Sequence, residues 1–189
     1  MFLDRYLTEL QTSLASLTDQ ESAIEGFVAR LVECISSGGR ILAFGNGGSS
    51  ATTSHFMADI SKYVRLNDGP PVRAICLSDN TPTLTAWAND VSYDVVFSEQ
   101  VQAHCQTGDV VIAVSCSGNS PNVINGVKQA NRMGAHTVGI CGFDGGELAK
   151  LVQTAIVVPG KRIQQIEDVH HALLHVVSVL IVEPLRSQA

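Results

Sequence analysis

Acidic and imidazole side chains recur at four-residue steps in two distant stretches of this sequence. The first stretch contains His55 and Asp59, and the second contains Glu167, His171 and His175. Residues four apart lie on the same face of a helix, so we expect each stretch to present its side chains together. An imidazole and a carboxylate at this spacing can share a divalent metal ion, and both groups can also carry protons.

Two short segments rich in glycine and serine, residues 44–50 and 114–122, each follow an apolar run and precede a predicted helix. Glycines let backbone amides approach a ligand, and a helix N-terminus favours negative charge, so both loops suit a phosphate. The first loop has neither the lysine of a Walker A loop nor the GxGxxG spacing, which makes ATP and NAD poor candidates. Because Ser115, Ser117 and Ser120 would lie at strand ends, the two loops favour one shared anion site.

The elements that must position these side chains alternate between short apolar runs and helical stretches. The runs are residues 41–44, 72–77, 110–114, 137–141 and 155–158. Several are apolar on both faces, as in a covered parallel sheet. The intervening helices are predicted over residues 50–63, 81–88, 95–104, 122–133 and 147–151. This alternation indicates an α/β, doubly wound sheet, with two further helices over residues 2–34 and one long helix over 163–185.

The composition of the chain argues against several classes of binding partner. The chain has 189 residues and a formal net charge of −6, which argues against a nucleic-acid partner because such proteins carry a basic excess. No run reaches the roughly 18 apolar residues of a membrane span, so we expect no membrane partner. Five scattered cysteines without a CxxC pair suggest reduced thiols. We predict one cytoplasmic domain over residues 1–189, with helical additions at 1–37 and 163–185.

Six segments together resemble the SIS (sugar isomerase) domain, and more narrowly its phosphoheptose isomerase branch. They are Gly45-Asn46-Gly47-Gly48-Ser49, His55-Phe56 with Asp59, Ala88-Asn89-Asp90, Ser115-Cys116-Ser117-Gly118-Asn119-Ser120, Gly142-Phe143-Asp144-Gly145-Gly146, and Glu167-Asp168-Val169-His170 with His175. The resemblance covers nearly the whole chain. It implies a flavodoxin-like, five-stranded parallel sheet flanked by helices, assembled as a homotetramer with its sites at subunit interfaces.

The resemblance also implies a zinc site. In this branch a His and a Glu on the first helix, with a Gln and a His on the last, bind Zn²⁺, and the Glu and the last His act as acid and base. Carried over, the metal ligands are His55, Asp59, Glu167 and His175, with Asp59 and His175 as the catalytic pair. Asp59 is one methylene shorter than the Glu of the family, and Glu167 is charged where the family has a neutral Gln.

Two alternatives within the last helix stay open. A different alignment places the Gln of the family on Gln164, but it leaves Ala172 where the second His belongs. Helical spacing favours His171 over His175 as the neighbour of Glu167, so His171 is a second candidate ligand.

The implied activity is the conversion of sedoheptulose 7-phosphate to D-glycero-D-manno-heptose 7-phosphate, by metal-assisted proton transfer through an enediol. The implied substrate-binding residues are Asn46, Gly47, Gly48, Ser49, Asn89, Asp90, Ser115, Cys116, Ser117, Ser120, Gln164 and Glu167. Two other functions remain possible at this stage. One is isomerisation of another phosphosugar, and the other is a non-catalytic tetramer that binds the bacterial replication initiator, as some proteins close to this branch do.

Overall fold

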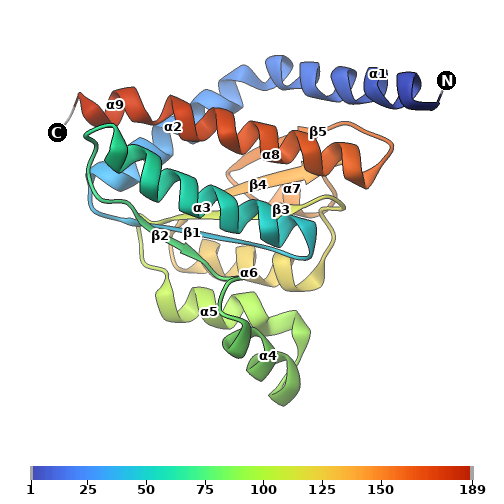
Figure 1. Cartoon of the computed structure of the whole chain (residues 1–189). Coiled ribbons are helices and arrows are strands. Elements are labelled where there is room, and N and C mark those ends of the chain that lie inside the picture. The colour runs from blue at the N-terminus through green and yellow to red at the C-terminus, as the bar shows by residue number, and fades with distance from the viewer. Residues whose placement is uncertain (1, 188–189) are drawn as a thin grey trace.

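A computed structural model describes residues 2–187, and its centre is a twisted sheet between two layers of helices (Figure 1). In the described residues the sheet has five parallel strands in the order β2-β1-β3-β4-β5. The strands are β1 (Arg40–Gly45), β2 (Arg73–Cys76), β3 (Val110–Ser115), β4 (His136–Gly142) and β5 (Thr154–Val158). This is the flavodoxin-like order, and it confirms the predicted fold class. The order reverses between β1 and β3, which pair in the register Ala43 with Ile112.

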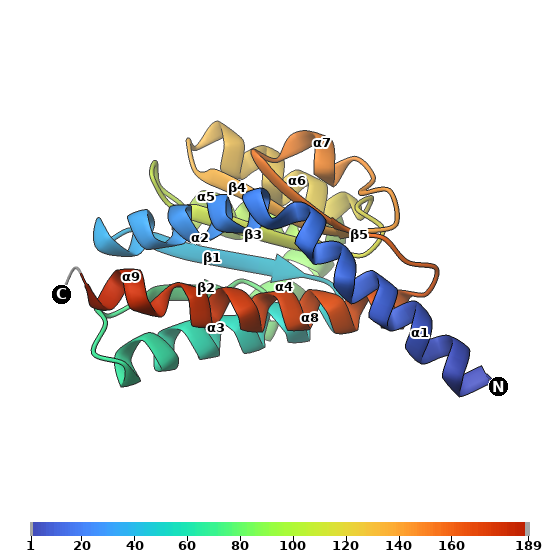
Figure 2. The same cartoon turned by 90° about the horizontal axis from the view of Figure 1, so that it is seen from above.

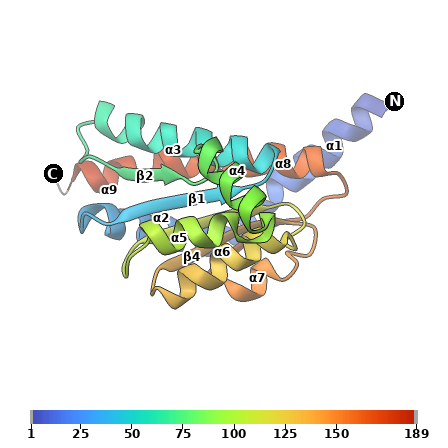
Figure 3. The ribbon, with the colours of Figure 1, turned by 90° about the horizontal axis from the view of Figure 1, so that it is seen from below.

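Helices cover both faces of the sheet, as Figure 3 shows from below. One face carries α2 (Glu21–Ser36), α3 (Gly48–Leu66) and α8 (Ile163–Leu180), and the other carries α4 (Thr81–Asp90), α5 (Val96–His104), α6 (Pro121–Arg132) and α7 (Leu148–Leu151). Each face has its own apolar core. Phe27, Ile60 and Leu173 are fully buried on the first face, and Phe44 stacks on Phe97 on the second.

Three short elements and one projecting helix complete the chain: η1 (Ser16–Gln20), η2 (Tyr93–Val95), α9 (Val182–Arg186) and α1 (Phe2–Ala15). Figure 2 shows α1 running past the end of the body. Near its middle, Tyr6 accepts a hydrogen bond from the buried Gln165 of α8 at 2.9 Å. Phe2 and Leu3 at its outer end remain exposed.

The predicted helix over residues 163–185 is interrupted in the structure. Helix α8 ends at Leu180 and α9 begins at Val182. Pro184 has no amide hydrogen for the carbonyl of Leu180, which explains a break at this point. The stretch Ile163–Arg186 is long and apolar enough to cross a membrane by length and composition. One side of it packs into the core through Leu173 and Val177, so we interpret it as a core helix.

Candidate active site

Helices α3 and α8 lie side by side and bring the two four-residue series together (Figures 1 and 2). Both helices follow a strand, so both start at the same edge of the sheet and run in the same direction. Helix α3 buries Phe56 and Ile60 against the sheet, which leaves His55 and Asp59 on the flank that faces α8. Helix α8 buries Leu174 in the same way and leaves His175 facing α3.

His55, Asp59 and His175 form a close triangle of donor atoms. The Nε2 atoms of His55 and His175 are 3.0 Å apart, and they lie 3.1 and 3.5 Å from Oδ2 of Asp59. Tetrahedral Zn²⁺ with bonds of about 2.0–2.1 Å separates its ligand atoms by about 3.3 Å. These three residues therefore fit a divalent metal ion with little movement.

His171 is the third imidazole of this cluster. Its ring centroid lies 4.7 Å from that of His55 and 4.4 Å from that of His175. One nitrogen from each of the three rings lies within 4.8 Å of the others. Burial, followed by the charges of His175 and His55, lowers the pKa of His171 and favours its neutral, metal-binding form.

Glu167 lies near the start of this helix pair, beside the first loop. A Cβ added to Gly48 would stand 2.7 Å from Cδ of Glu167, so the carboxyl group covers the first turn of α3. His55 comes seven residues after Gly48, and His175 comes eight after Glu167. The structure thus places Glu167 next to the loop and the imidazoles about two turns further along.

The first loop is fixed by its backbone and by one amide pair. Gly47 has a φ of 55°, and a Cβ on Gly45 would stand 2.8 Å from the carbonyl oxygen of Val114. Asn46 exchanges two hydrogen bonds of 2.9 Å with Asn122 at the start of α6. The hydroxyl of Tyr93 donates to Oδ1 of Asn46 at 2.8 Å. This loop is therefore tied both to the second loop and to the turn after α4.

The second loop places hydroxyls at the end of β3. The hydroxyl oxygens of Ser115 and Ser120 are 3.4 Å apart, and Ser117 is exposed beside them. Gly118 has a φ of 63°, and its Cα faces the carbonyl oxygen of Gly145 too closely for any side chain. The segment around residues 142–146, which the sequence singled out, therefore braces this loop.

Cys116 joins the two loops. Its thiol is buried and interacts with the hydroxyl of Ser49 from the first loop. Burial, and secondarily the charge of Glu167, raises the pKa of Cys116 to about 11, so the thiol stays protonated near neutral pH. Ser49 itself is buried where α3 begins, so the hydroxyls of both loops meet at one place.

Some predicted site residues are not drawn into this arrangement. Asn89 and Asp90 are exposed at the end of α4 and bond to each other at 2.8 Å. Gln164 is exposed in the first turn of α8. Conversely, Tyr93 was not singled out from the sequence, although it follows closely after Asn89-Asp90 in the chain. Asn122 was quoted as part of the second loop, but its pairing with Asn46 is visible only in the structure.

Small ligands of flavodoxin-like proteins bind where the strand order reverses, beyond the carboxyl ends of the strands. Here that place carries hydroxyls and two helix N-termini, which suit a phosphate group. Fold and site therefore define an α/β protein whose loops are suited to a small phosphorylated ligand.

Comparisons with known proteins are more specific. The sequence model of the SIS domain matches residues 5–142. A probable phosphoheptose isomerase of Thermoplasma acidophilum is 39% identical over 179 residues, which cover 95% of this chain and 97% of that protein. The phosphoheptose isomerase of Citrifermentans bemidjiense is 35% identical over 92% of this chain and 88% of its own length. The structure of phosphoheptose isomerase GmhA from Neisseria gonorrhoeae superposes with a TM-score of 0.83 at 32% identity, covering 96% of this chain and 98% of that one.

The chain therefore belongs to the SIS-domain family, within the group of phosphoheptose isomerases. This confirms the resemblance drawn from the sequence motifs, and it confirms the prediction that the chain is an isomerase.

Proposed function

We propose that this isomerase interconverts sedoheptulose 7-phosphate and D-glycero-D-manno-heptose 7-phosphate. The observation that carries the proposal is the position of the hydroxyl-bearing loops at the start of the α3–α8 pair, with the imidazole–carboxylate cluster about two helical turns further along. His55 comes seven positions after Gly48 on α3, a distance of about 10 Å along the helix axis. An open-chain seven-carbon sugar phosphate has a similar span between its phosphate and its reactive carbons.

The phosphate group is held by neutral donors in this proposal. The hydroxyls of Ser49, Ser117 and Ser120 and the backbone amides at the starts of α3 and α6 would donate to its oxygens. Local donors are needed because the chain carries a formal net charge of −6, which repels an anion at long range. The charge at a helix N-terminus and the hydrogen bonds act at short range, where they dominate.

Asp59 and His175 carry the protons in this proposal. Oδ2 of Asp59 faces the imidazoles, which leaves Oδ1 for the substrate. Asp59 takes the proton from C1 of the ketose and returns it to C2, while His175 moves the hydroxyl proton from O1 to O2 as the enediol collapses to the aldose. Each positioned acid or base contributes about 10²–10⁴-fold to the rate.

His55, Asp59 and His175 would hold the metal ion, because their donor atoms already have the separation that Zn²⁺ requires. Resemblance to the family adds Glu167 to this set. A bound Zn²⁺ would polarise the carbonyl and stabilise the negative charge that develops on the oxygens.

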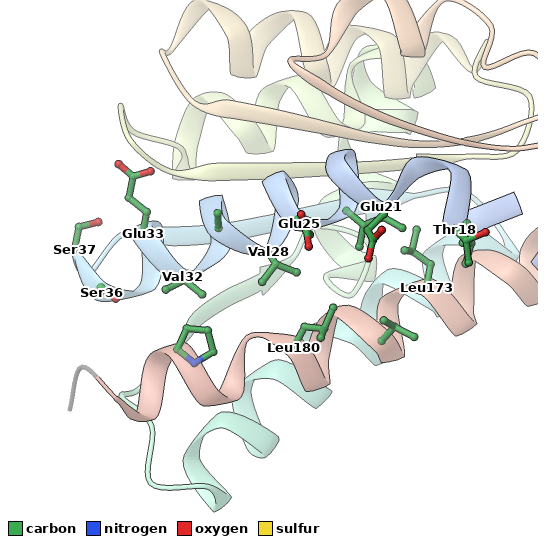
Figure 4. Close-up of a pocket in the computed structure, with 15 residues that line it drawn as sticks. Thr18, Glu21, Glu25, Val28, Val32, Glu33, Ser36, Ser37, Leu173 and Leu180 are labelled. Carbon is green, nitrogen blue, oxygen red and sulfur yellow. The ribbon is translucent and has the colours of Figure 1, made fainter. Parts of the chain in front are cut away.

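We further propose that the chain assembles as a cytoplasmic homotetramer. An apolar groove of about 1130 Å³ lies between α2 and α8, with Val28, Val32 and Leu180 on its walls and three glutamates on its rim (Figure 4). The projecting helix α1 exposes Phe2, Leu3, Leu7 and Leu14, so one copy offers an apolar helix that the groove of another could bury. Light scattering on the full chain and on Val28→Glu tests this, because the variant should give a smaller particle.

The activity is tested by turnover of sedoheptulose 7-phosphate by the Zn²⁺-loaded protein. Asp59→Asn and His175→Ala should lose most of the activity, while their metal-free forms keep the melting temperature of the metal-free wild type, because neither side chain is fully buried. Full activity in both variants contradicts the proton assignment. Faster turnover of a shorter phosphosugar contradicts the substrate assignment, and capture of the replication initiator without any turnover favours the non-catalytic alternative.

A further inference from the structure

His171 is placed to bind the same metal ion as His55 and His175. It comes four residues before His175 on α8, just as His55 comes four residues before Asp59 on α3. The two facing helices therefore present two pairs with the same spacing. Two histidines four apart on one helical face are a recurrent zinc-binding arrangement, because one turn of helix separates them by only about 6 Å.

Glu167 is the competing ligand, and the structure places it less favourably. It lies eight residues from His175, about 12 Å along the helix axis. Its carboxyl group covers Gly48, whereas the group of mutually close donor atoms consists of His55, His171 and His175. Glu167 would have to leave the loop to reach the imidazoles.

We propose that His171 is a metal ligand of this enzyme and completes a set of three imidazoles and one carboxylate with His55, His175 and Asp59. This inference rests on the metal centre of the proposed function. It assigns Glu167 to the loop end of the site, in contrast to the ligand set that the family resemblance implies. The site keeps a net positive charge, because one carboxylate only half neutralises the ion.

The movement that this requires of the three imidazoles is small. The donor nitrogens of the three rings lie within 4.8 Å of one another, and ligand atoms around Zn²⁺ lie about 3.3 Å apart. A shift of about 1.5 Å or less in the ring of His171 closes this gap. The ring is only half-buried, so it can rotate without opening the core.

The test measures metal affinity directly. The apo forms of the full-length wild type, His171→Ala, Glu167→Ala and His104→Ala are titrated with Zn²⁺ in competition with a chromophoric chelator, and the visible spectra of the Co²⁺-loaded forms are recorded. His104 is an exposed histidine outside the cluster and controls for the loss of an imidazole. Circular dichroism melting confirms that each variant folds.

We expect His171→Ala to lose at least about 10–100-fold in Zn²⁺ affinity, the loss that even outer partners of metal ligands cause, and to change the Co²⁺ spectrum. Glu167→Ala and His104→Ala should remain within about 3-fold of the wild type. Unchanged affinity in His171→Ala, or an equal loss in Glu167→Ala, overturns the inference while the metal centre stands. Failure of the wild type to bind either ion overturns the metal centre as well.

Discussion

The site along α3 and α8 has two ends, the loops at the helix starts and the imidazoles about two turns further on, and they are built in different ways. At the loop end, the geometry is set by backbone and buried contacts: glycines with positive φ, the buried Ser49, and the amide exchange between Asn46 and Asn122. At the imidazole end, half-exposed side chains on two regular helices are brought together. The loop end is therefore fixed by contacts within the protein, whereas in our proposal a metal ion completes the imidazole end.

The largest expected effect is a loss of activity, without a loss of stability, when a side chain of the imidazole end is removed. His55→Ala removes a proposed metal ligand, so turnover should fall at least about 100-fold. The free energy of unfolding of the metal-free protein should change by less than about 0.5 kcal/mol, because the side chain is half exposed. Steady-state kinetics and urea denaturation measure the two quantities. A large loss of stability in the apo variant would show that this end, too, is part of the rigid frame.

The opposite result is expected at the loop end. Gly118→Ala combines a φ of 63° with a collision between the new Cβ and the carbonyl oxygen of Gly145, so the variant should lose about 2–4 kcal/mol of unfolding free energy. Gly38→Ala is the matched control, since Gly38 has a φ of 74° but open space around its Cα. That variant should lose only about 1–2 kcal/mol from backbone strain. Equal losses in the two variants would contradict the bracing role of residues 142–146.

A buried histidine next to the cluster, His170, should make the stability of the protein depend on pH. His170 points away from the active site, and its Nε2 bonds to the carbonyl oxygen of Cys141 on β4. Burial lowers the pKa of His170 to about 4 from 6.5. Because the folded pKa is the lower one, the unfolded chain binds more protons between these values, and stability falls as the pH drops below about 6.5.

Between pH 7 and pH 5 the contribution of His170 to the free energy of unfolding should fall by about 2 kcal/mol. His170→Asn should be less stable than the wild type at pH 7 but should lose less stability on acidification. Urea denaturation across this pH range measures both slopes. Parallel slopes would assign the acid sensitivity to other groups.

The smallest expected effect concerns the tie between the loop end and the turn after α4. Tyr93→Phe removes one hydrogen bond to Asn46, worth about 0.5–1.5 kcal/mol. KM for the sugar phosphate should rise about 2–10-fold, while kcat changes little. The measurement is a full saturation curve for the variant and the wild type. A fall in kcat without a change in KM would place Tyr93 with the chemical step instead.

The sequence predicted the sheet and the loops well because both depend on local patterns. Apolar runs such as residues 110–114 ended at glycine and serine, and the four-residue spacing placed His55 and Asp59 on one face. The competition between Glu167 and His171 could not be decided in this way, because it depends on where each lies against α3. The bond from Tyr93 to Asn46 spans 47 positions and has no local pattern.

Because α3 and α8 run parallel, the number of helical turns between the loops and the imidazoles sets the distance between them. A phosphorylated triose or tetrose with its phosphate in the loops would be too short for its reactive carbons to reach the cluster. With its reactive carbons at the cluster, its phosphate would no longer contact the loops. The enzyme could then select a sugar phosphate by its number of carbon atoms without contacting the hydroxyl groups in the middle of the chain. Discrimination between stereoisomers at those carbons would need contacts from other residues.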